Sequence, residues 1–157
     1  MKILVLSDSH GDLKTLKKAA DKYSRNADII VHCGDGTKGD VEFLKENYKN
    51  SMIIAVKGNC DFGSSLNNYE KINIEGKNIL ITHSHLQNTK FTLVNLSYKA
   101  LEENCDMVFF GHTHIPTDQT FGDVRLINPG SCSGWNGSCA VVEIDQKQNV
   151  LVNLIKL

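Results

Sequence analysis

Three short, mainly apolar runs separated by helical segments constrain the fold of this chain more than any other feature. The runs at residues 2–6, 29–32 and 52–56 have the length and composition of buried strands. Residues 12–23 and 41–48, which lie between them, place their apolar side chains at helical spacing. A strand–helix–strand–helix–strand order of this kind predicts a parallel sheet.

The second half of the chain has a different pattern. Residues 69–74 and 78–82 are predicted to form a hairpin that turns at residues 75–77, and a helix at 92–103 precedes a strand at 107–110. Further strands are predicted at 117–121, 124–127, 138–144 and 150–156, with turns that make this part mostly antiparallel. We therefore expect an α/β fold with two packed mixed sheets flanked by helices.

Length and composition limit the classes of protein to consider. A chain of 157 residues favours one domain, here 1–157, and 41% hydrophobic and 22% charged residues are ordinary for a globular protein. The net charge of −1 argues against a nucleic-acid binder, which would need a local basic patch. No apolar run is long enough to cross a membrane, and the one at the N-terminus is too short for a signal peptide. We predict a cytoplasmic protein with no membrane partner.

The five cysteines predict neither a disulfide framework nor a cysteine zinc site. Their number is odd and no CxxC pair occurs. Four are therefore expected to be buried free thiols, and Cys60 differs from them because it lies in one of the motifs described next.

Polar motifs follow the ends of five predicted strands. They read SDSH at 7–10, CGDG at 33–36, KGNCD at 57–61, THSH at 82–85 and GHTH at 111–114. Ligands of open α/β sheets bind outside the carboxyl ends of the strands, so these segments are expected to meet at one edge. Their metal-ligating residues are Asp8, His10, Asp35, Asn59, His83, His112 and His114.

These residue types indicate a centre with two divalent ions. Carboxylates and imidazoles bind Mn, Fe, Zn or Ni, and Mg is a further possibility; we favour Mn. Seven ligands are too many for one ion, but they suit two ions that share a bridging carboxylate. Such a pair holds a phosphoryl group and lowers the pKa of a bridging water, and the resulting hydroxide attacks phosphorus in line.

The spacing within two motifs gives further expectations. Residues i and i+2 of an extended segment point the same way, so Asp8 and His10 can reach one site together. If the GHTH turn is not extended, His112 and His114 can reach different ions. Gly34, Gly58 and Gly111 directly precede ligands, where they permit tight turns.

The chain resembles the calcineurin-like metallophosphoesterase superfamily. The five motifs match its signature blocks in order, and residues 128–131, Asn-Pro-Gly-Ser, match its small YfcE-like and archaeal phosphodiesterase branch, which is related to the retromer subunit. The resemblance implies an α/β/β/α sandwich that hydrolyses phosphomonoesters or phosphodiesters. It also implies that Asp35 bridges two ions, one held by Asp8, His10 and His114, the other by Asn59, His83 and His112.

Two departures from the family pattern bear on activity. Many members have a histidine where this chain has Cys60, and a neutral thiol is a poorer acid for a developing alkoxide, so substrates with good leaving groups are expected. Ser84 stands where glycine is common. The only arginines, Arg25 and Arg125, lie outside the motifs, which favours a singly charged phosphodiester over a phosphate dianion.

Other polar residues near the motifs have open roles. We count Asp35, Asn59, His83, Cys60 and His85 as candidate catalytic residues, with His85 equally suited to contact phosphate or to support a ligand. Asp61 can orient a neighbouring group, Lys90 can meet a phosphate, and His32 is expected to be a buried, hydrogen-bonded histidine. Asn128 and Ser131 are expected to shape a loop beside the site.

The sequence therefore predicts a metal-dependent phosphodiesterase acting on a small phosphodiester. A homodimer is the default expectation for so small an enzyme. Two alternatives stay open. One is a protein-interaction scaffold of the same fold with weak catalysis, against which every ligand position is filled by a competent residue. The other is a nuclease, against which the near-neutral charge counts.

Overall fold

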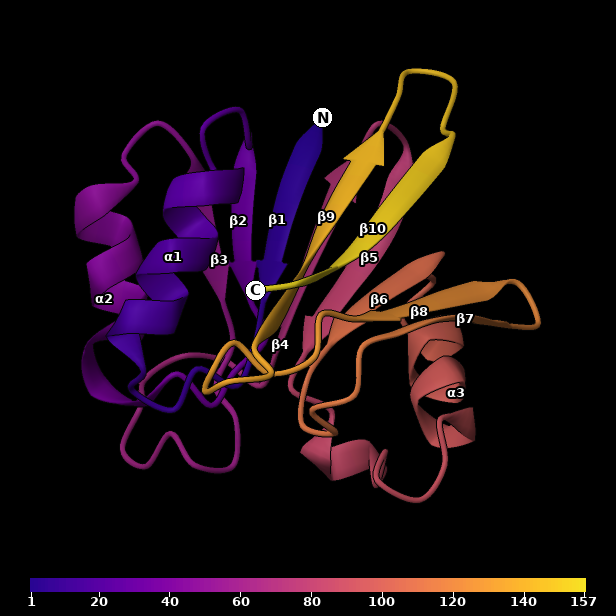
Figure 1. Ribbon diagram of the computed structural model, residues 1–157. Helices are drawn as coiled ribbons and strands as arrows, with labels where there is room; N and C mark the ends of the chain where they lie inside the picture. Colours follow the sequence, from indigo (N-terminus) through magenta and orange to yellow (C-terminus); the bar gives the residue numbers. More distant parts are fainter.

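Two five-stranded sheets pack face to face between helices (Figure 1). The computed structural model describes residues 1–157, apart from the side chain of Lys38. The first sheet has the order β10–β9–β1–β2–β3, formed by Val150–Lys156, Ser138–Ile144, Lys2–Leu6, Ile29–His32 and Met52–Ala55. The second has the order β4–β5–β6–β8–β7, formed by Tyr69–Ile74, Lys77–Thr82, Met107–Phe110, Val124–Asn128 and Thr117–Phe121.

The helices cover the outer faces of the two sheets. α1 (Leu13–Tyr23) and α2 (Thr37–Asn47) lie against the first sheet, and α3 (Val94–Glu102) lies against the second (Figure 1). Asp12 begins α1 by accepting a hydrogen bond from the Thr15 amide at 3.0 Å, as an N-cap residue does. The predicted α/β sandwich with flanking helices is thus confirmed.

Alternation along the strands builds the core. In β1, Ile3 and Val5 point between the sheets, whereas Leu4 and Leu6 point toward α1 and α2. β6 does the same, with Phe109 between the sheets and Phe110 toward α3. Burying a side chain of this size contributes about 1.5–3 kcal/mol, so both layers stabilise the strands that carry the site.

Strand directions agree with the prediction for the first half and differ in part for the second. β1, β2 and β3 are parallel, as predicted. The strands of the second half form four antiparallel pairs and two parallel ones, so this part is mostly antiparallel, as predicted, but β6 pairs in parallel with both β5 and β8. The reason is that α3 acts as a crossover between β5 and β6. β9 and β10, although they follow in the sequence, belong to the first sheet.

Some element boundaries also differ. α2 begins at Thr37, four residues before the predicted start, because its first turn is polar and lacks an apolar periodicity. β5 begins at Lys77, since Glu75 and Gly76 alone form the hairpin turn with φ values of 49° and 84°. No helix in the described part of the chain is both long and apolar enough to cross a membrane.

Candidate metal centre

The five polar motifs lie in turns at the carboxyl ends of β1, β2, β3, β5 and β6, at the lower end of the molecule in Figure 1. Five of the predicted ligands have backbone φ values between 47° and 72°, a left-handed conformation that non-glycine residues rarely adopt: Asp8, His10, Asp35, His112 and His114. Such strain persists where the surrounding structure imposes it, typically at functional sites.

All three predicted glycines are required by the close approach of other segments of the chain. A Cβ atom on Gly34 would lie 2.7 Å from the backbone nitrogen of Gly58. A Cβ atom on Gly58 would lie 2.1 Å from Oδ1 of Asp35, and one on Gly111 would lie 2.0 Å from Oγ of Ser7 and 2.8 Å from Oδ2 of Asp8. Any side chain at Gly58 or Gly111 would therefore displace a ligand carboxylate.

The first group of ligand atoms surrounds one oxygen of Asp8. Oδ2 of this buried carboxylate accepts hydrogen bonds from the Ser7 hydroxyl at 2.6 Å and the His112 amide at 3.0 Å. Oδ1 is also buried but has no hydrogen-bond partner, although Nε2 of His114 lies 3.1 Å away and Nε2 of His10 lies 3.9 Å away. The two imidazole nitrogens are 3.4 Å apart.

The second group is centred on His83. Its Nδ1 donates to the carbonyl of Cys33 at 2.9 Å, which leaves Nε2 as the nitrogen that faces the other polar side chains. Nε2 lies 3.1 Å from Oδ1 of Asn59, 3.3 Å from Oδ2 of Asp35 and 4.0 Å from Oδ1 of Asp8. Backbone carbonyls often fix metal-binding histidines in this tautomer.

These observations fit divalent ions. An orphaned, buried carboxylate oxygen costs free energy unless a cation or donor compensates it, and Asp8 supplies one at the point where three imidazoles converge. Two ligand atoms about 2.1 Å from one ion, at a right angle, lie about 3 Å apart, close to the separations seen here. The carboxylate, imidazole and amide donors are those that first-row divalent ions accept.

Asp35 and His83 influence each other's protonation. Burial alone would raise the pKa of Asp35, but the contact with His83 and the hydrogen bond from the Cys60 amide at 2.7 Å bring it below its ordinary value. Burial alone would lower the pKa of His83, but Asp35 and the charge of Asp8 raise it. Asp35 is therefore ionised at neutral pH and available to a cation.

His112 and His85 complete the histidine cluster around His83. The ring centroids of these two residues lie 5.0 Å and 5.4 Å from that of His83. Burial, with the charges of His83 and Lys90, lowers the pKa of His112 to about 4, so its imidazole is neutral. Burial and His83 also lower the pKa of His85, whose buried Nδ1 has no hydrogen-bond partner. His85 thus lies beside the centre and has a buried ring nitrogen without a partner.

Asp61 holds two of the motif turns together. Its carboxylate accepts hydrogen bonds from the amides of Asp35, Gly58 and Thr37 at 2.7–2.8 Å. The sequence indicated only that Asp61 could orient a neighbouring group, and the structure shows that it ties the turn after β2 to the turn after β3.

The reasoning from an extended Asp8–His10 segment was wrong, although the two side chains do meet. Both residues have positive φ values, of 53° and 47°, so a turn and not strand alternation brings them together. The GHTH turn is not extended either. His112 consequently lies beside His83, whereas His114 lies beside Asp8 and His10.

A buried polar network behind the ligands was only partly predicted. The Gly34 amide donates to Nδ1 of His32, so Nε2 of His32 donates to Oγ of Ser9 at 2.9 Å, and Ser9 donates to Asp40 at 2.6 Å. Burial lowers the pKa of His32, in agreement with a neutral ring. His32 is the buried, hydrogen-bonded histidine that was expected, but no sequence signal linked Asp40 to it.

Three further residues support the turns. Asn128 and Ser131 were predicted to shape a loop beside the site, and Ser84 is the third. Asn128 donates to the Gly111 carbonyl at 3.1 Å, and Ser131 donates to the Asp8 carbonyl at 2.8 Å. Ser84 has a φ of 72°, which explains why glycine is common there, and its hydroxyl is hydrogen-bonded to that of Thr89 at 2.8 Å. That side-chain bond helps to hold the left-handed conformation.

Cys60 lies at the centre and also in a neighbouring cleft. The nearby Asp35 carboxylate, together with burial, raises the pKa of its thiol to about 11. The cleft has a volume of about 430 Å³ and lies between α2 and residues 60–66, with Val41, Phe62 and Leu66 among its lining residues. The other four cysteines are buried free thiols, as predicted.

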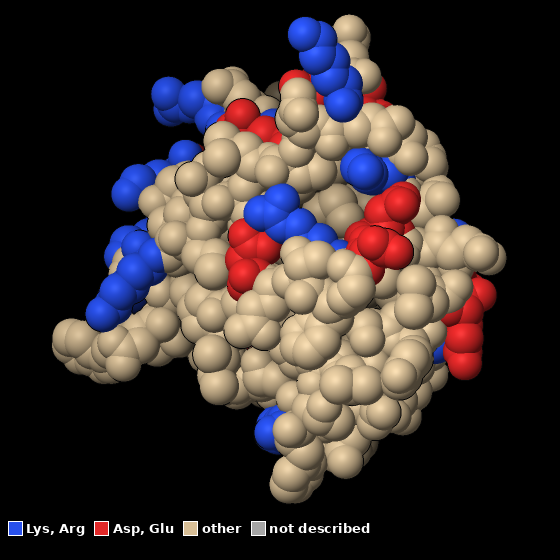
Figure 2. All heavy atoms as spheres, turned by 90° about the vertical axis from the view of Figure 1, so that its right-hand side faces the viewer, with Lys and Arg blue, Asp and Glu red and all other residues tan. Residues whose placement is uncertain are grey.

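The surface near the centre has little charge on the side that carries α3 and β7. Figure 2 shows that Lys, Arg, Asp and Glu gather on the upper part of this face, whereas few lie on its lower part. Large apolar side chains are instead exposed in the loops that follow the strands: Phe62, Leu86, Phe91, Ile115 and Trp135. Among the described residues, the lower part of this face shows no basic track for a nucleic-acid backbone.

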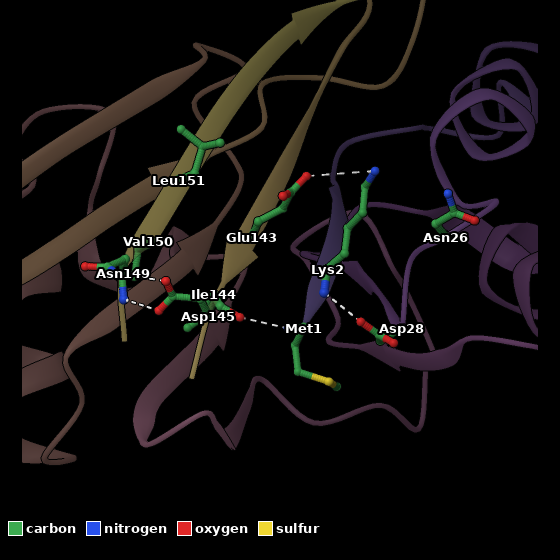
Figure 3. Close-up of a pocket in the computed structure, with 10 residues that line it drawn as sticks. All are labelled: Met1, Lys2, Asn26, Asp28, Glu143, Ile144, Asp145, Asn149, Val150 and Leu151. Atoms are coloured by element: carbon green, nitrogen blue, oxygen red, sulfur yellow. Dashed lines mark hydrogen bonds and ion pairs between the residues drawn. The ribbon is translucent and has the colours of Figure 1, made fainter. Parts of the chain in front are cut away.

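A larger hollow, of about 810 Å³, lies elsewhere on the surface. Figure 3 shows it at the opposite end of the first sheet, between Met1, Lys2, Asp28 and the β9–β10 turn. Several of its polar groups pair with one another: Asp28 accepts from the Lys2 amide at 2.7 Å, and Glu143 lies 3.9 Å from Nζ of Lys2. It contains no group left free for a ligand comparable to Asp8 Oδ1.

Known proteins resemble this chain in both sequence and fold. The chain is 36% identical over 131 residues to the probable metallophosphoesterase YsnB of Bacillus subtilis, with 83% of this chain and 75% of that protein covered. It is 30% identical over 156 residues to the phosphodiesterase YfcE of Escherichia coli, with 85% and 80% covered.

Two solved structures show the same fold. An archaeal phosphodiesterase superposes with a TM-score of 0.78 at 25% identity, over 99% of this chain and 100% of that one. Zinc-bound Vps29 from Entamoeba histolytica superposes with a TM-score of 0.76 at 19% identity, over 99% of each chain, and supports the fold alone.

The family comparison covers nearly the whole chain. Residues 1–147 match the family described as the calcineurin-like phosphoesterase superfamily domain. The ordered motifs, the sandwich fold and the convergence of carboxylates and imidazoles agree with this match. The chain belongs to the calcineurin-like phosphoesterase superfamily.

Proposed function

We propose that the protein is a phosphodiesterase that holds two divalent metal ions, and that residues 1–157 act as one domain. The observation that supports a dinuclear centre most directly is the position of Asp35. Its carboxylate belongs to a group of potential ligands with Asp8 and His83 and to a second group with His10 and Cys60. A carboxylate shared between two groups is suited to bridge two ions.

The remaining ligands divide around this bridge. His10, His114 and Asp8 lie on one side, and His83 and Asn59 lie on the other, with His112 next to His83. Bound divalent ions would neutralise phosphoryl charge and make a water molecule more acidic. The turns hold the donors in place, since Asp61 and Ser131 fix the backbones of Asp35 and Asp8.

The other polar groups suit a substrate with one negative charge. Arg125 is engaged by Asp118 through two hydrogen bonds of 2.7 Å, so it cannot hold a phosphate at the centre. His85, whose ring centroid lies 5.4 Å from that of His83, is placed to contact a phosphoryl oxygen. Lys90 is near enough to His112 to lower its pKa and adds one positive charge. This modest charge fits a phosphodiester better than a phosphate dianion.

Cys60 occupies the position from which a leaving group would be protonated in many relatives. Its thiol has a raised pKa of about 11 and is therefore protonated at neutral pH, but it is a weak partner for an alkoxide. We therefore propose a preference for phosphodiesters with good leaving groups, such as aryl esters. The cleft beside Cys60 can accept an apolar group against Val41, Phe62 and Leu66.

Two measurements test the proposal. The protein is freed of metal with EDTA, loaded with Mn, passed through a desalting column and analysed for metal per chain and for hydrolysis of bis(p-nitrophenyl) phosphate. Two bound ions and Mn-dependent turnover are expected. One ion per chain would overturn the dinuclear centre, and no turnover with Mn, Ni, Fe, Zn or Mg would favour the scaffold. Steeply salt-dependent binding to DNA or RNA would favour the nuclease.

The cytoplasmic location and the homodimer stay predictions. Sedimentation analysis would test the homodimer.

A further inference from the structure

We propose that Cys60 is a metal-selecting ligand, whose sulfur binds the ion held by His10 and Asp35 and makes that position prefer thiophilic ions such as Zn²⁺ and Cd²⁺. This inference rests on the metal centre proposed above and adds a donor to it. The seven ligands deduced from the sequence are all nitrogen or oxygen donors, and the sulfur changes the chemistry of one ion only.

The geometry brings three potential ligands together from three separate turns. One ligand atom each from His10, Asp35 and Cys60 lies within 4.8 Å of the other two. These residues follow β1, β2 and β3, so the fold itself, and not the neighbourhood of one loop, creates the group. The Cys60 amide donates to Oδ1 of Asp35 at 2.7 Å and fixes the cysteine against the carboxylate that would bind the same ion.

Asn59 prepares the sulfur for this role. The Nδ2 group of Asn59 donates to Sγ of Cys60 at 3.3 Å, while its Oδ1 lies 3.1 Å from Nε2 of His83. The amide thus presents its oxygen to the His83 side and its N–H to the thiol. An N–H donor stabilises the negative charge that sulfur carries when it binds a metal.

The other cysteines lack these features. Cys33, Cys105, Cys132 and Cys139 are buried, and among the described residues none of them forms a group of potential ligands with histidine or carboxylate side chains. Cys60 is partly exposed, so an ion can reach it. A buried cysteine of the same chain, such as Cys105, therefore serves as a matched control for Cys60.

The chemistry of sulfur determines which ions gain. When the metal–sulfur bond forms, the S–H proton leaves to solvent, and no electron transfer is involved. Thiolate is a soft ligand that binds Zn²⁺ and Cd²⁺ strongly but adds little for the hard ions Mn²⁺ and Mg²⁺. We therefore expect Cys60 to raise affinity for the soft ions and to leave affinity for Mn²⁺ nearly unchanged.

Cadmium and cobalt titrations test the proposal without an activity assay. The metal-free protein, its Cys60→Ser variant and its Cys105→Ser variant are titrated with Cd²⁺ and Co²⁺ while near-ultraviolet absorption is recorded. A thiolate-to-metal charge-transfer band is expected in the wild type and in Cys105→Ser and is expected to be absent in Cys60→Ser. A band of equal strength in Cys60→Ser, or no band in the wild type that still binds Cd²⁺, would overturn the proposal.

Affinities measured by competition give a second readout. The Cys60→Ser change is expected to weaken Zn²⁺ binding at least about tenfold and Mn²⁺ binding less than about twofold. An unchanged ratio of the two affinities would contradict metal selection by Cys60. If the wild type binds neither Mn²⁺ nor Cd²⁺, the metal centre itself fails, and this outcome is distinct from binding without a thiolate band.

Discussion

The two ends of the first sheet differ in whether their polar groups have hydrogen-bond partners. At the carboxyl ends of β1 and β2, the buried Oδ1 of Asp8 has no partner, and three predicted ligands, Asp8, His10 and Asp35, have left-handed backbones. At the other end, the larger hollow of Figure 3 is lined by groups that pair with one another, as Asp145 does with the amides of Lys147 and Asn149. Buried groups without partners and strained turns mark a functional end better than the size of a hollow does.

The largest expected effect concerns the carboxylate that joins the two ligand groups. Asp35→Asn keeps the shape of the side chain but removes the charge that both ions would share. Loss of a supporting residue typically costs about 10–100-fold in metal affinity or activity, so loss of this ligand is expected to lower turnover more than about 100-fold. Retained turnover, measured with Mn on an aryl phosphodiester, would remove the bridging role from Asp35.

A carboxylate at each end permits a matched comparison. Asp61 accepts three backbone amides at the functional end, and Asp145 accepts two amides and the Asn149 side chain at the other. Asp61→Asn turns one acceptor into a donor and loosens the turn of Asp35, so metal affinity is expected to fall about 10–100-fold. Asp145→Asn is expected to leave it unchanged.

Equal effects of these two changes on metal affinity would break the comparison. Unfolding by urea serves as the control for stability, because both changes disturb a turn that is held by hydrogen bonds to a carboxylate. Similar small losses of stability, combined with a loss of metal affinity only in Asp61→Asn, would sharpen the distinction between the two ends.

Protonation is expected to affect only the functional end near neutral pH. The six histidines of the chain lie in or beside the turns of that end, and the pKa of His83 is raised above its ordinary value of 6.5. Binding a metal requires neutral His83, so Mn affinity is expected to fall by up to about tenfold per pH unit below the His83 pKa.

The same pKa has the opposite consequence for the metal-free protein. A raised pKa stabilises the fold below the unfolded pKa, and this contribution disappears as pH rises through the folded pKa. The lowered pKa values of His32, His85 and His112 act in the opposite sense below the ordinary value of 6.5, so the His83 contribution is read above that pH. There the metal-free protein is expected to lose stability as pH rises, whereas the metal-loaded protein is not. Parallel urea unfolding curves over about pH 6.5–8 measure both, and identical pH profiles would contradict the assignment of His83.

The sequence predicted where the ligands gather but not how their turns are built. Motifs after buried strands were sufficient to bring Asp8, Asp35 and His83 to one edge, because parallel strands end on the same side of a sheet. The left-handed backbone at His10 and His112 depends on contacts from distant segments, which a local pattern cannot reveal. The Ser9–His32–Asp40 network was missed in part for the same reason.

The same limit applies to strand pairing. Apolar periodicity predicted each strand of the second sheet but not that β6 would have parallel neighbours on both sides. α3 packs on the outer face of this sheet and supplies the crossover between β5 and β6, while β7 lies at the sheet edge and leaves β8 beside β6. Local patterns therefore predict elements more reliably than the order in which they pair.

The smallest expected effect concerns the apolar rim of the functional end. Phe62 is 86% exposed and lines the cleft next to Cys60, so an aryl group of a substrate could cover its ring. Phe62→Ala is expected to raise KM for an aryl phosphodiester about fivefold, the equivalent of about 1 kcal/mol of lost contact, with kcat nearly unchanged. Leu151→Ala removes an exposed apolar side chain from the hollow at the other end and is expected to change neither constant. If both variants behave like the wild type, the cleft beside Cys60 does not hold the ester group, and the substrate must enter from the His85 side of the centre.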